Sequence, residues 1–280
     1  MTGFLGHSIL GAYTAAQSSV TLSAMKLPKL PGLEDFLPEQ NLFQGTFFAM
    51  NRIIMIRLIM TFLIVLILGI TAARAKLIPS RWQGAVEWVI EFVQNNITFQ
   101  VMGELRGKKY TPLITSIFLT IACFNLCGVI PGANIAATAT VVMPLFFALV
   151  TVFNYCWTAH KEQGFFKFLR NEMFPPGVPW PVYIILAPIQ LLEIFIFRPL
   201  SLTLRLFANM ISGHLIVAIC FCLTQFYLVS QAGPIKIVGG VWFLGGFVLT
   251  CFEIFVALLQ AYIFAVLTTV YINSSFPEAE

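Results

Sequence analysis

The chain has 280 residues, of which 59% are hydrophobic and only 10% are charged, and its mean hydropathy is +0.88. These values exclude an ordinary soluble domain and predict an all-α polytopic membrane protein. The formal net charge of +4 comes largely from connecting segments, so it does not indicate binding to nucleic acid.

The first 45 residues form a separate segment, with the membrane domain following at 46–280. They contain no continuous apolar stretch and end in a proline-rich acidic sequence at 28–39, so no cleaved signal peptide is expected. The first membrane span is predicted at 53–73. Arg52 and Arg57 lie at its entrance, where we expect them to snorkel or to face protein.

An amphipathic helix is predicted at about 80–103. Its apolar side chains alternate at helical spacing with Glu87, Glu91 and Gln94, which is typical of a helix lying on the membrane surface. Two further spans follow at about 113–130 and 139–157.

The last hundred residues are nearly continuous apolar helix, predicted at 182–229 and 238–273. A helix over 182–229 would be about 70 Å long at about 1.5 Å per residue, more than twice a hydrocarbon core of roughly 30 Å. It therefore either breaks near Pro199, which would give six crossings, or lies strongly tilted. Because no polar loop divides it, we favour five spans, with the last two helices forming a long, strongly tilted hairpin.

The distribution of basic residues predicts the orientation. Most of them lie in the loops after the first and third spans, and the opposite side of the membrane has only Lys26, Lys29 and Lys236. By the positive-inside rule, the N-terminus lies outside and the C-terminus is cytoplasmic. The residues of the basic side, in the loops after the first and third spans, are Arg74, Lys76, Arg81, Arg106, Lys108, Lys109, Lys161, Lys167 and Arg170.

One face of the penultimate helix carries a cation within the membrane. Ser201, Arg205 and Asn209 follow one another at intervals of four, which places them on one face. An arginine at the bilayer centre costs roughly 3 to more than 10 kcal/mol, so it usually faces a partner carboxylate or a water-filled path. His214 lies nine residues beyond Arg205, a rotation of about 180°, and so points away from this face.

In the last helix, Glu253 and Gln260 are seven residues apart and share a face. His214 and Glu253 are therefore candidates for a separate polar path.

Structural explanations remain open for these residues. Asn209, Ser201 and Gln260 could join helices through hydrogen bonds, and His214 could be an interior histidine with satisfied partners. Arg205 could form a salt bridge with Glu253. Arg198 could snorkel beside Pro199, or it could pair with Glu193.

Three segments together resemble a known family. They are RPLSLTLRLFANMISGH at 198–214, FEIFVALLQAYIFAVLTTVY at 252–271 and NLCGVIP at 125–131, and they closely resemble subunit a of the F-type ATP synthase of bacteria. The resemblance covers roughly 50–275. It implies a stator subunit that passes protons to and from a rotating c-ring through two offset half-channels, so that proton flow is coupled to ATP synthesis.

The resemblance also implies the roles of individual residues. Arg205 would be the essential charge facing the c-ring carboxylate, and His214 with Glu253 would be the proton-access pair. In some bacterial members the histidine and the acid occupy exchanged positions. Further partners implied are b-type peripheral stalk subunits and the remainder of the complex, in the bacterial plasma membrane. The proton-path residues implied are His214, Glu253, Asn209, Gln260 and Ser201.

Other classes of membrane protein fit less well. A haem-bearing subunit would need paired axial histidines, but only His214 lies in a predicted span. An ion-coupled carrier would usually contain an internal repeat, and none is visible. The chain has no phosphate-binding Walker loop, and its six cysteines follow no metal-site spacing. We therefore expect neither enzymatic activity toward nucleotide nor a cofactor or metal.

Overall fold

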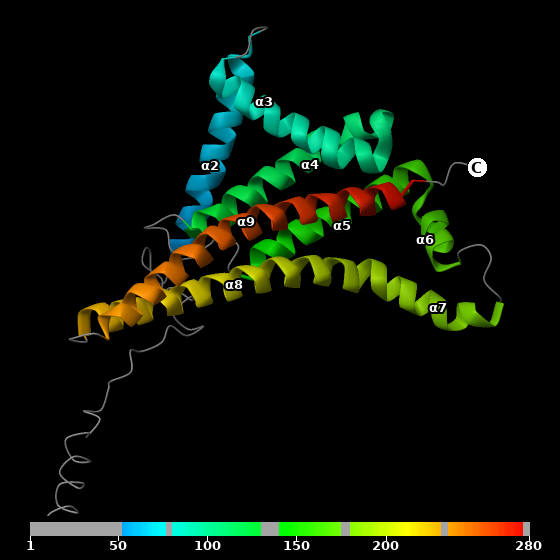
Figure 1. Ribbon diagram of the computed structural model, residues 1–280. Coiled ribbons are helices and arrows are strands. Elements are labelled where there is room, and N and C mark those ends of the chain that lie inside the picture. The colour runs from blue at the N-terminus through cyan, green and yellow to red at the C-terminus, as the bar shows by residue number, and fades with distance from the viewer. Residues whose placement is uncertain (1–51, 77–79, 130–139, 175–179, 231–234, 277–280) are drawn as a thin grey trace, which may run out of the picture.

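The computed structural model describes residues 52–76, 80–129, 140–174, 180–230 and 235–276, which form helices and no strands (Figure 1). By length and composition, five helical stretches could cross a membrane. The prediction of an all-α polytopic membrane protein is therefore confirmed, while the predicted N-terminal segment at 1–45 lies outside the described residues. The five stretches are Ile53–Ala73, Arg81–Val129, Val142–Glu162, Tyr183–Val229 and Lys236–Ser274.

The first span, α2 (Arg52–Ala73), is largely exposed and packs against the start of α3 and against α4. The expectation that Arg57 faces protein is confirmed, because its guanidinium donates a hydrogen bond to the Thr140 hydroxyl. The side chain of Arg52 lies outside the described set.

The predicted surface helix ends where glycine permits a sharp turn. Helix α3 (Arg81–Val93) continues through a π-helical segment, Gln94–Thr98, into α4 (Phe99–Leu126). Inside α4, Gly103 has φ 73° and ψ 171°, a conformation that side chains with a Cβ rarely adopt. The chain turns there, so the surface helix and the helix of the following span are two separate helices, as predicted.

The helix that contains the second span begins before the predicted span of about 113–130. It starts just beyond Gly103 and passes through Pro112. Proline disfavours a helix interior because it lacks an N–H group. The burial of neighbouring Thr111 and Ile114 in the core outweighs this local preference.

The third span, α5 (Val142–Glu162), extends five residues beyond its predicted end at 157. It is followed by the short amphipathic α6 (Phe165–Met173), which begins after Gly164 at φ 84°. Helix α6 packs against α5 and α7.

The last two spans form the predicted hairpin. Helix α7 (Trp180–Leu192) continues without a break through a π-helical segment, Glu193–Phe197, into α8 (Arg198–Gln225) and a second π-helical segment, Phe226–Ser230. Helix α9 (Lys236–Ser274) runs back alongside α8 (Figure 1).

The lengths of these helices require a tilt. The spans have 47 and 39 residues, or about 70 and about 60 Å at about 1.5 Å per residue. Both greatly exceed a hydrocarbon core of roughly 30 Å, so neither can stand upright in a bilayer. Because the helix continues through Pro199, the alternative of a break near this residue is wrong.

The π-helical segment explains how the helix continues past Pro199. The Arg198 N–H donates to the carbonyl of Glu193, five residues back, and Pro199 has no N–H to offer. The carbonyl of Ile194 thereby loses its usual helical donor. The Tyr155 hydroxyl of α5 donates to this carbonyl at 2.6 Å, and both residues are fully buried.

Helix α9 lies at the centre of the bundle, where it packs against α4, α5 and α8. The small residues Ala257, Ala261 and Ala265 recur on its buried face at intervals of four, and such spacing lets membrane helices approach closely. Two polar contacts also join the helices. The Asn125 side chain donates to the Ala257 carbonyl at 3.3 Å, and the hydroxyls of Thr151 and Thr268 lie 3.2 Å apart.

Tyr155→Phe should destabilise the fold without changing its packing volume greatly. The variant leaves the buried carbonyl of Ile194 without a donor, which should cost about 1–3 kcal/mol. Thermal unfolding of the detergent-purified chain measures the loss. Tyr262→Phe is the matched control, because no hydrogen bond of the half-buried Tyr262 hydroxyl is seen among the described residues. Equal melting temperatures for the two variants would contradict this account.

Candidate functional site

The outward face of α8 carries the predicted polar residues. Ser201 and Arg205 are exposed and Asn209 is half-buried, as expected for residues spaced by four on one face. The predicted division of the helix into two faces is therefore confirmed. The residues one position after each of these three are Leu202, Leu206 and Met210, all fully buried.

Arg205 has no carboxylate partner within the described part of the chain. The four ion pairs there involve other residues, so the salt bridge with Glu253 considered above does not form. A guanidinium keeps its proton at working pH, and an uncompensated charge inside a bilayer is costly. The exposed position of Arg205 therefore suits a partner that another subunit supplies.

His214 and Glu253 meet on the buried side of α8. The Nδ1 atom of His214 lies 2.9 Å from Oε1 of Glu253 on α9, and each side chain is only 7% exposed. The 2.9 Å contact is close, but its angles are not those of a hydrogen bond, so Glu253 Oε1 has no hydrogen-bond partner among the described residues. His214 Nε2 has none there either. Both groups can bind and release protons, so they can pass a proton between them and to water or to a further group.

Gly213 is a site residue that the sequence did not single out. A Cβ atom at this position would lie 3.0 Å from Glu253 Oε1 and 3.4 Å from Glu253 Cδ. The glycine therefore allows the carboxylate to lie against the backbone of α8 beside His214. In the sequence, only its position directly before His214 could have marked Gly213 as a site residue. The need for glycine arises from the Glu253 side chain of α9, which packs against it.

Gln260 is buried on α9, two helical turns beyond Glu253. Within the described residues, its Nε2 atom has no hydrogen-bond partner, and no contact joins it to Arg205. The structure thus brings His214 and Glu253 together, whereas the roles of Gln260, Ser201 and Asn209 remain predictions.

A second charged cluster surrounds Arg198, whose side chain is only 11% exposed. Its guanidinium lies 3.8 Å from a Glu172 oxygen and 3.7 Å from a Glu193 oxygen, and 5.2 Å from the centre of the Tyr271 ring. The predicted pairing with Glu193 is confirmed. Snorkelling of Arg198 to the interface is wrong, because the residue is enclosed by α6 and α9.

Glu172 could not be identified from the sequence, since it lies on α6 and reaches Arg198 only through the tertiary fold. Burial raises the pKa of the Glu172 carboxyl above its ordinary value, and Glu193 acts in the same direction, while the Arg198 guanidinium partly offsets the shift.

Comparison with known proteins identifies relatives along most of the chain. Residues 53–273 match the family described as ATP synthase A chain. The chain is 36% identical over 255 residues to ATP synthase subunit a of Rhodococcus erythropolis, which covers 91% of this chain and 93% of the relative. It is 35% identical over 208 residues to the subunit of Frankia alni, covering 74% and 71% of the two chains. The subunit of Streptomyces lividans is 29% identical over 255 residues, covering 89% and 88%.

The raised pKa of Glu172 predicts a specific dependence of stability on pH. The folded chain holds this proton at pH values where the unfolded chain has released it. The contribution is therefore greatest below the ordinary carboxyl pKa and is lost as the pH rises through the raised pKa of the folded state. The melting temperature of the wild type minus that of Glu172→Gln should fall as the pH is raised from 4 to 7. A difference that stays flat or rises would contradict the assignment.

Proposed function

Because the chain belongs to the family of ATP synthase subunit a, we propose that the two polar faces of α8 serve separate proton routes to a rotating c-ring. As a member of this family, the chain is a proton-translocating, multi-pass membrane subunit of the ATP synthase complex. It contributes to the proton channel and does not itself catalyse the chemistry of ATP.

Arg205 acts in this proposal as a fixed positive charge between the two routes. It attracts a c-ring carboxylate only while that carboxylate is ionised, and the carboxylate must be neutralised before it enters lipid, where a bare charge is costly. Since the guanidinium does not exchange its proton, protons cannot pass directly from one route to the other. They must travel on the ring instead.

The outer route uses His214 and Glu253. Their 2.9 Å contact and the buried His214 Nε2 atom, which has no hydrogen-bond partner among the described residues, suit a pair that takes protons from water and loads the ring carboxylate. Gln260 lies on the same helix as Glu253, closer to the C-terminal end of that helix, and would assist near the ring. The inner route would use water beside Ser201 and Asn209, on the face that carries Arg205.

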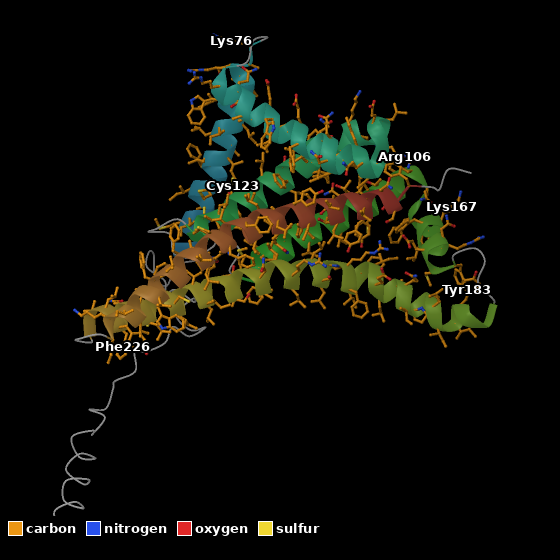
Figure 2. The ribbon with its side chains drawn as sticks, in the orientation of Figure 1. Lys76, Arg106, Cys123, Lys167, Tyr183 and Phe226 are labelled. Carbon is orange, nitrogen blue, oxygen red and sulfur yellow. The ribbon has the colours of Figure 1, made fainter. Side chains whose placement is uncertain are left out.

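Basic residues support the orientation of the subunit. Figure 2 shows Lys76, Arg106 and Lys167 on one side of the molecule and Phe226, next to the hairpin turn, far from them. The positive-inside rule assigns the basic side to the cytoplasm, so the N-terminus lies outside and the C-terminus inside a bacterial plasma membrane. The c-ring would pack on the exposed face of α8, and b-type peripheral stalk subunits would hold the chain as part of the stator.

The observation that supports this proposal most strongly is the division of charge on α8. Arg205 is exposed without an ion-pair partner in the described part of the chain, while His214 is buried against Glu253 on the opposite face. A purely structural arginine would be enclosed by carboxylates, as Arg198 is. The contrast between these two arginines separates a charge kept for another subunit from one used within the chain.

Arg205→Ala should abolish ATP-driven proton pumping by the assembled complex, because the ring carboxylate loses the charge that attracts it and divides the routes. Acidification of inverted membrane vesicles, followed with a pH-sensitive dye, measures pumping, and ATP hydrolysis by the detached catalytic head should persist. Arg170→Ala is the control, since this exposed arginine lies on α6, and it should pump at a rate within about twofold of wild type. Coupled pumping retained by Arg205→Ala would refute the proposal.

Glu253→Gln, His214→Ala and Gly213→Ala should each slow pumping without stopping it, because all three disturb the same acid and imidazole pair. We expect reductions of about a hundredfold for the first two, the lower end of the usual range for loss of a proton-transfer group. The reduction for Gly213→Ala should be smaller, since the added methyl only displaces the Glu253 carboxylate.

Gly69→Ala is the matched control for the glycine variant, because a Cβ at this position on α2 would meet no atom within 4 Å. The same vesicle assay compares initial rates at equal amounts of assembled complex. Rates equal to wild type in both Glu253→Gln and His214→Ala would remove the pair from the proton path.

A further inference from the structure

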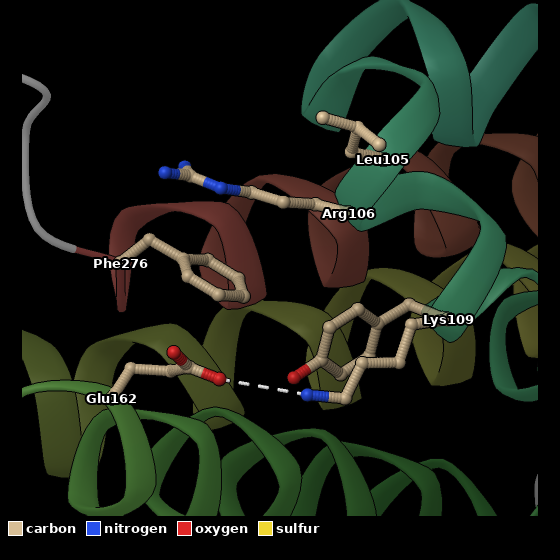
Figure 3. Close-up of a pocket in the computed structure, with 6 residues that line it drawn as sticks. Leu105, Arg106, Lys109, Glu162 and Phe276 are labelled. Carbon is tan, nitrogen blue, oxygen red and sulfur yellow. Dashed lines mark hydrogen bonds and ion pairs between the residues drawn. The ribbon is translucent and has the colours of Figure 1, made fainter.

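A pocket of about 270 Å³ lies where three membrane-crossing helices end (Figure 3). The beginning of α4 after Gly103, the end of α5 and Phe276, which lies two residues beyond α9, all meet there. These ends place the pocket at the boundary between hydrocarbon and headgroups on the basic side of the chain. Its lining residues are Leu105, Arg106, Lys109, Tyr110, Glu162 and Phe276.

The charges of the pocket leave one cation uncompensated. Lys109 Nζ lies 3.5 Å from a Glu162 oxygen, in a pair whose side chains are 53% and 34% exposed, and such an exposed pair is weak. Arg106 has no carboxylate partner in the described part of the chain. Its guanidinium carbon lies 4.5 Å from the centre of the Phe276 ring, and Figure 3 shows the two side chains side by side.

Aromatic and aliphatic groups border these cations. The Tyr110 hydroxyl lies 3.1 Å from that of Thr158, which directs the Tyr110 ring beside Lys109, whose Nζ is 5.4 Å from the ring centre. Leu105 is 95% exposed although it adjoins helices that pack closely. An exposed apolar side chain beside an unpaired cation, at the membrane boundary, suits a molecule that is itself amphipathic.

We propose that this pocket binds the phosphate headgroup of an anionic phospholipid in the adjacent leaflet. The Arg106 guanidinium donates two parallel hydrogen bonds to phosphate oxygens, and Lys109 turns from Glu162 to add a point charge. The Tyr110 and Phe276 rings border the glycerol region, and Leu105 contacts the acyl chains. A basic pocket between membrane helices at this depth is a recognised type of headgroup site.

The charge balance distinguishes a lipid from a free phosphate ion. Among the described residues that line it, two cations and one carboxylate give the pocket one net positive charge. A single charge holds a free ion weakly, because water and salt compete for it. An acyl chain adds apolar contact with Leu105 and holds the headgroup at the boundary. The proposal requires only that the chain spans a membrane, so it is independent of the proton routes proposed above.

The assembled ATP synthase complex, reconstituted in phosphatidylcholine vesicles with one fifth phosphatidylglycerol, provides the test. A phosphatidylglycerol with a photoreactive group near its headgroup should label the peptide that contains residues 104–110. The double variant Arg106→Gln with Lys109→Gln should reduce this labelling at least fivefold, and Arg106→Lys should give an intermediate value because it keeps charge but not paired donors.

Matched controls test whether any basic residue at the surface would behave alike. Lys167→Gln with Arg170→Gln removes two exposed cations of α6 and should leave labelling of 104–110 unchanged, as should 10 mM inorganic phosphate. Equal labelling in the wild type and the Arg106 and Lys109 variant would overturn the proposal. Displacement of the probe by inorganic phosphate would assign the pocket to a free anion instead. Loss of a partner subunit from the variant complex, without a change in labelling, would assign it to a protein contact.

The proton-pumping assay separates this proposal from the proposed function. The Arg106 and Lys109 variant should pump protons in vesicles, since neither residue lies on the proton routes, while it loses the lipid contact. Failure of Arg205→Ala to abolish pumping would refute the proton routes and leave the lipid site standing.

Discussion

A guanidinium cannot release its proton under working conditions, so Arg205 carries its charge wherever α8 holds it. The described part of the chain supplies no carboxylate to compensate it, and yet the helix presents it outward from a membrane-spanning segment. Such a position suits a carboxylate brought by another subunit or a water-filled path. The other polar groups fit this constraint, since Glu253, the acid that could neutralise Arg205, is held by His214 on the opposite, buried face of α8.

The Arg205 face and the His214 face of α8 stay on opposite sides only if the helix that carries them is unbroken. Proline at 199 and a length of about 70 Å, at about 1.5 Å per residue, would both favour a break, but a π-helical segment accommodates the proline. The orphaned carbonyl of Ile194 is satisfied from α5 by the Tyr155 hydroxyl. Just beyond it, Arg198 is held between two carboxylates and the ring of Tyr271. Arg198 and Arg205, seven positions apart on α8, thus differ: the first is bound within the chain and the second is left for a partner.

Close packing of α9 makes the buried pair possible. Alanines at intervals of four let the helix approach its neighbours, and Gly213 leaves space for the Glu253 carboxylate against α8. Two residues beyond the other end of the same helix, the Phe276 ring lies 4.5 Å from the Arg106 guanidinium carbon. One helix therefore joins the interior polar pair to the surface where lipid headgroups would lie.

The sequence by itself determined the class, the five spans, the surface helix and the division of α8 into two faces, because hydrophobic periodicity and helical spacing are local properties of the chain. It also indicated the pairing of Arg198 with Glu193, which are five residues apart on one continuous helix. Only the tertiary structure decided that Glu172 completes this cluster, that Gly213 must be small and that Tyr155 supports the π-helical segment. Each of these depends on contacts between helices distant in the chain, which spacing along a single helix cannot specify. Helix α4 continues through Pro112 for the same reason, since interhelical packing outweighs the local preference of proline.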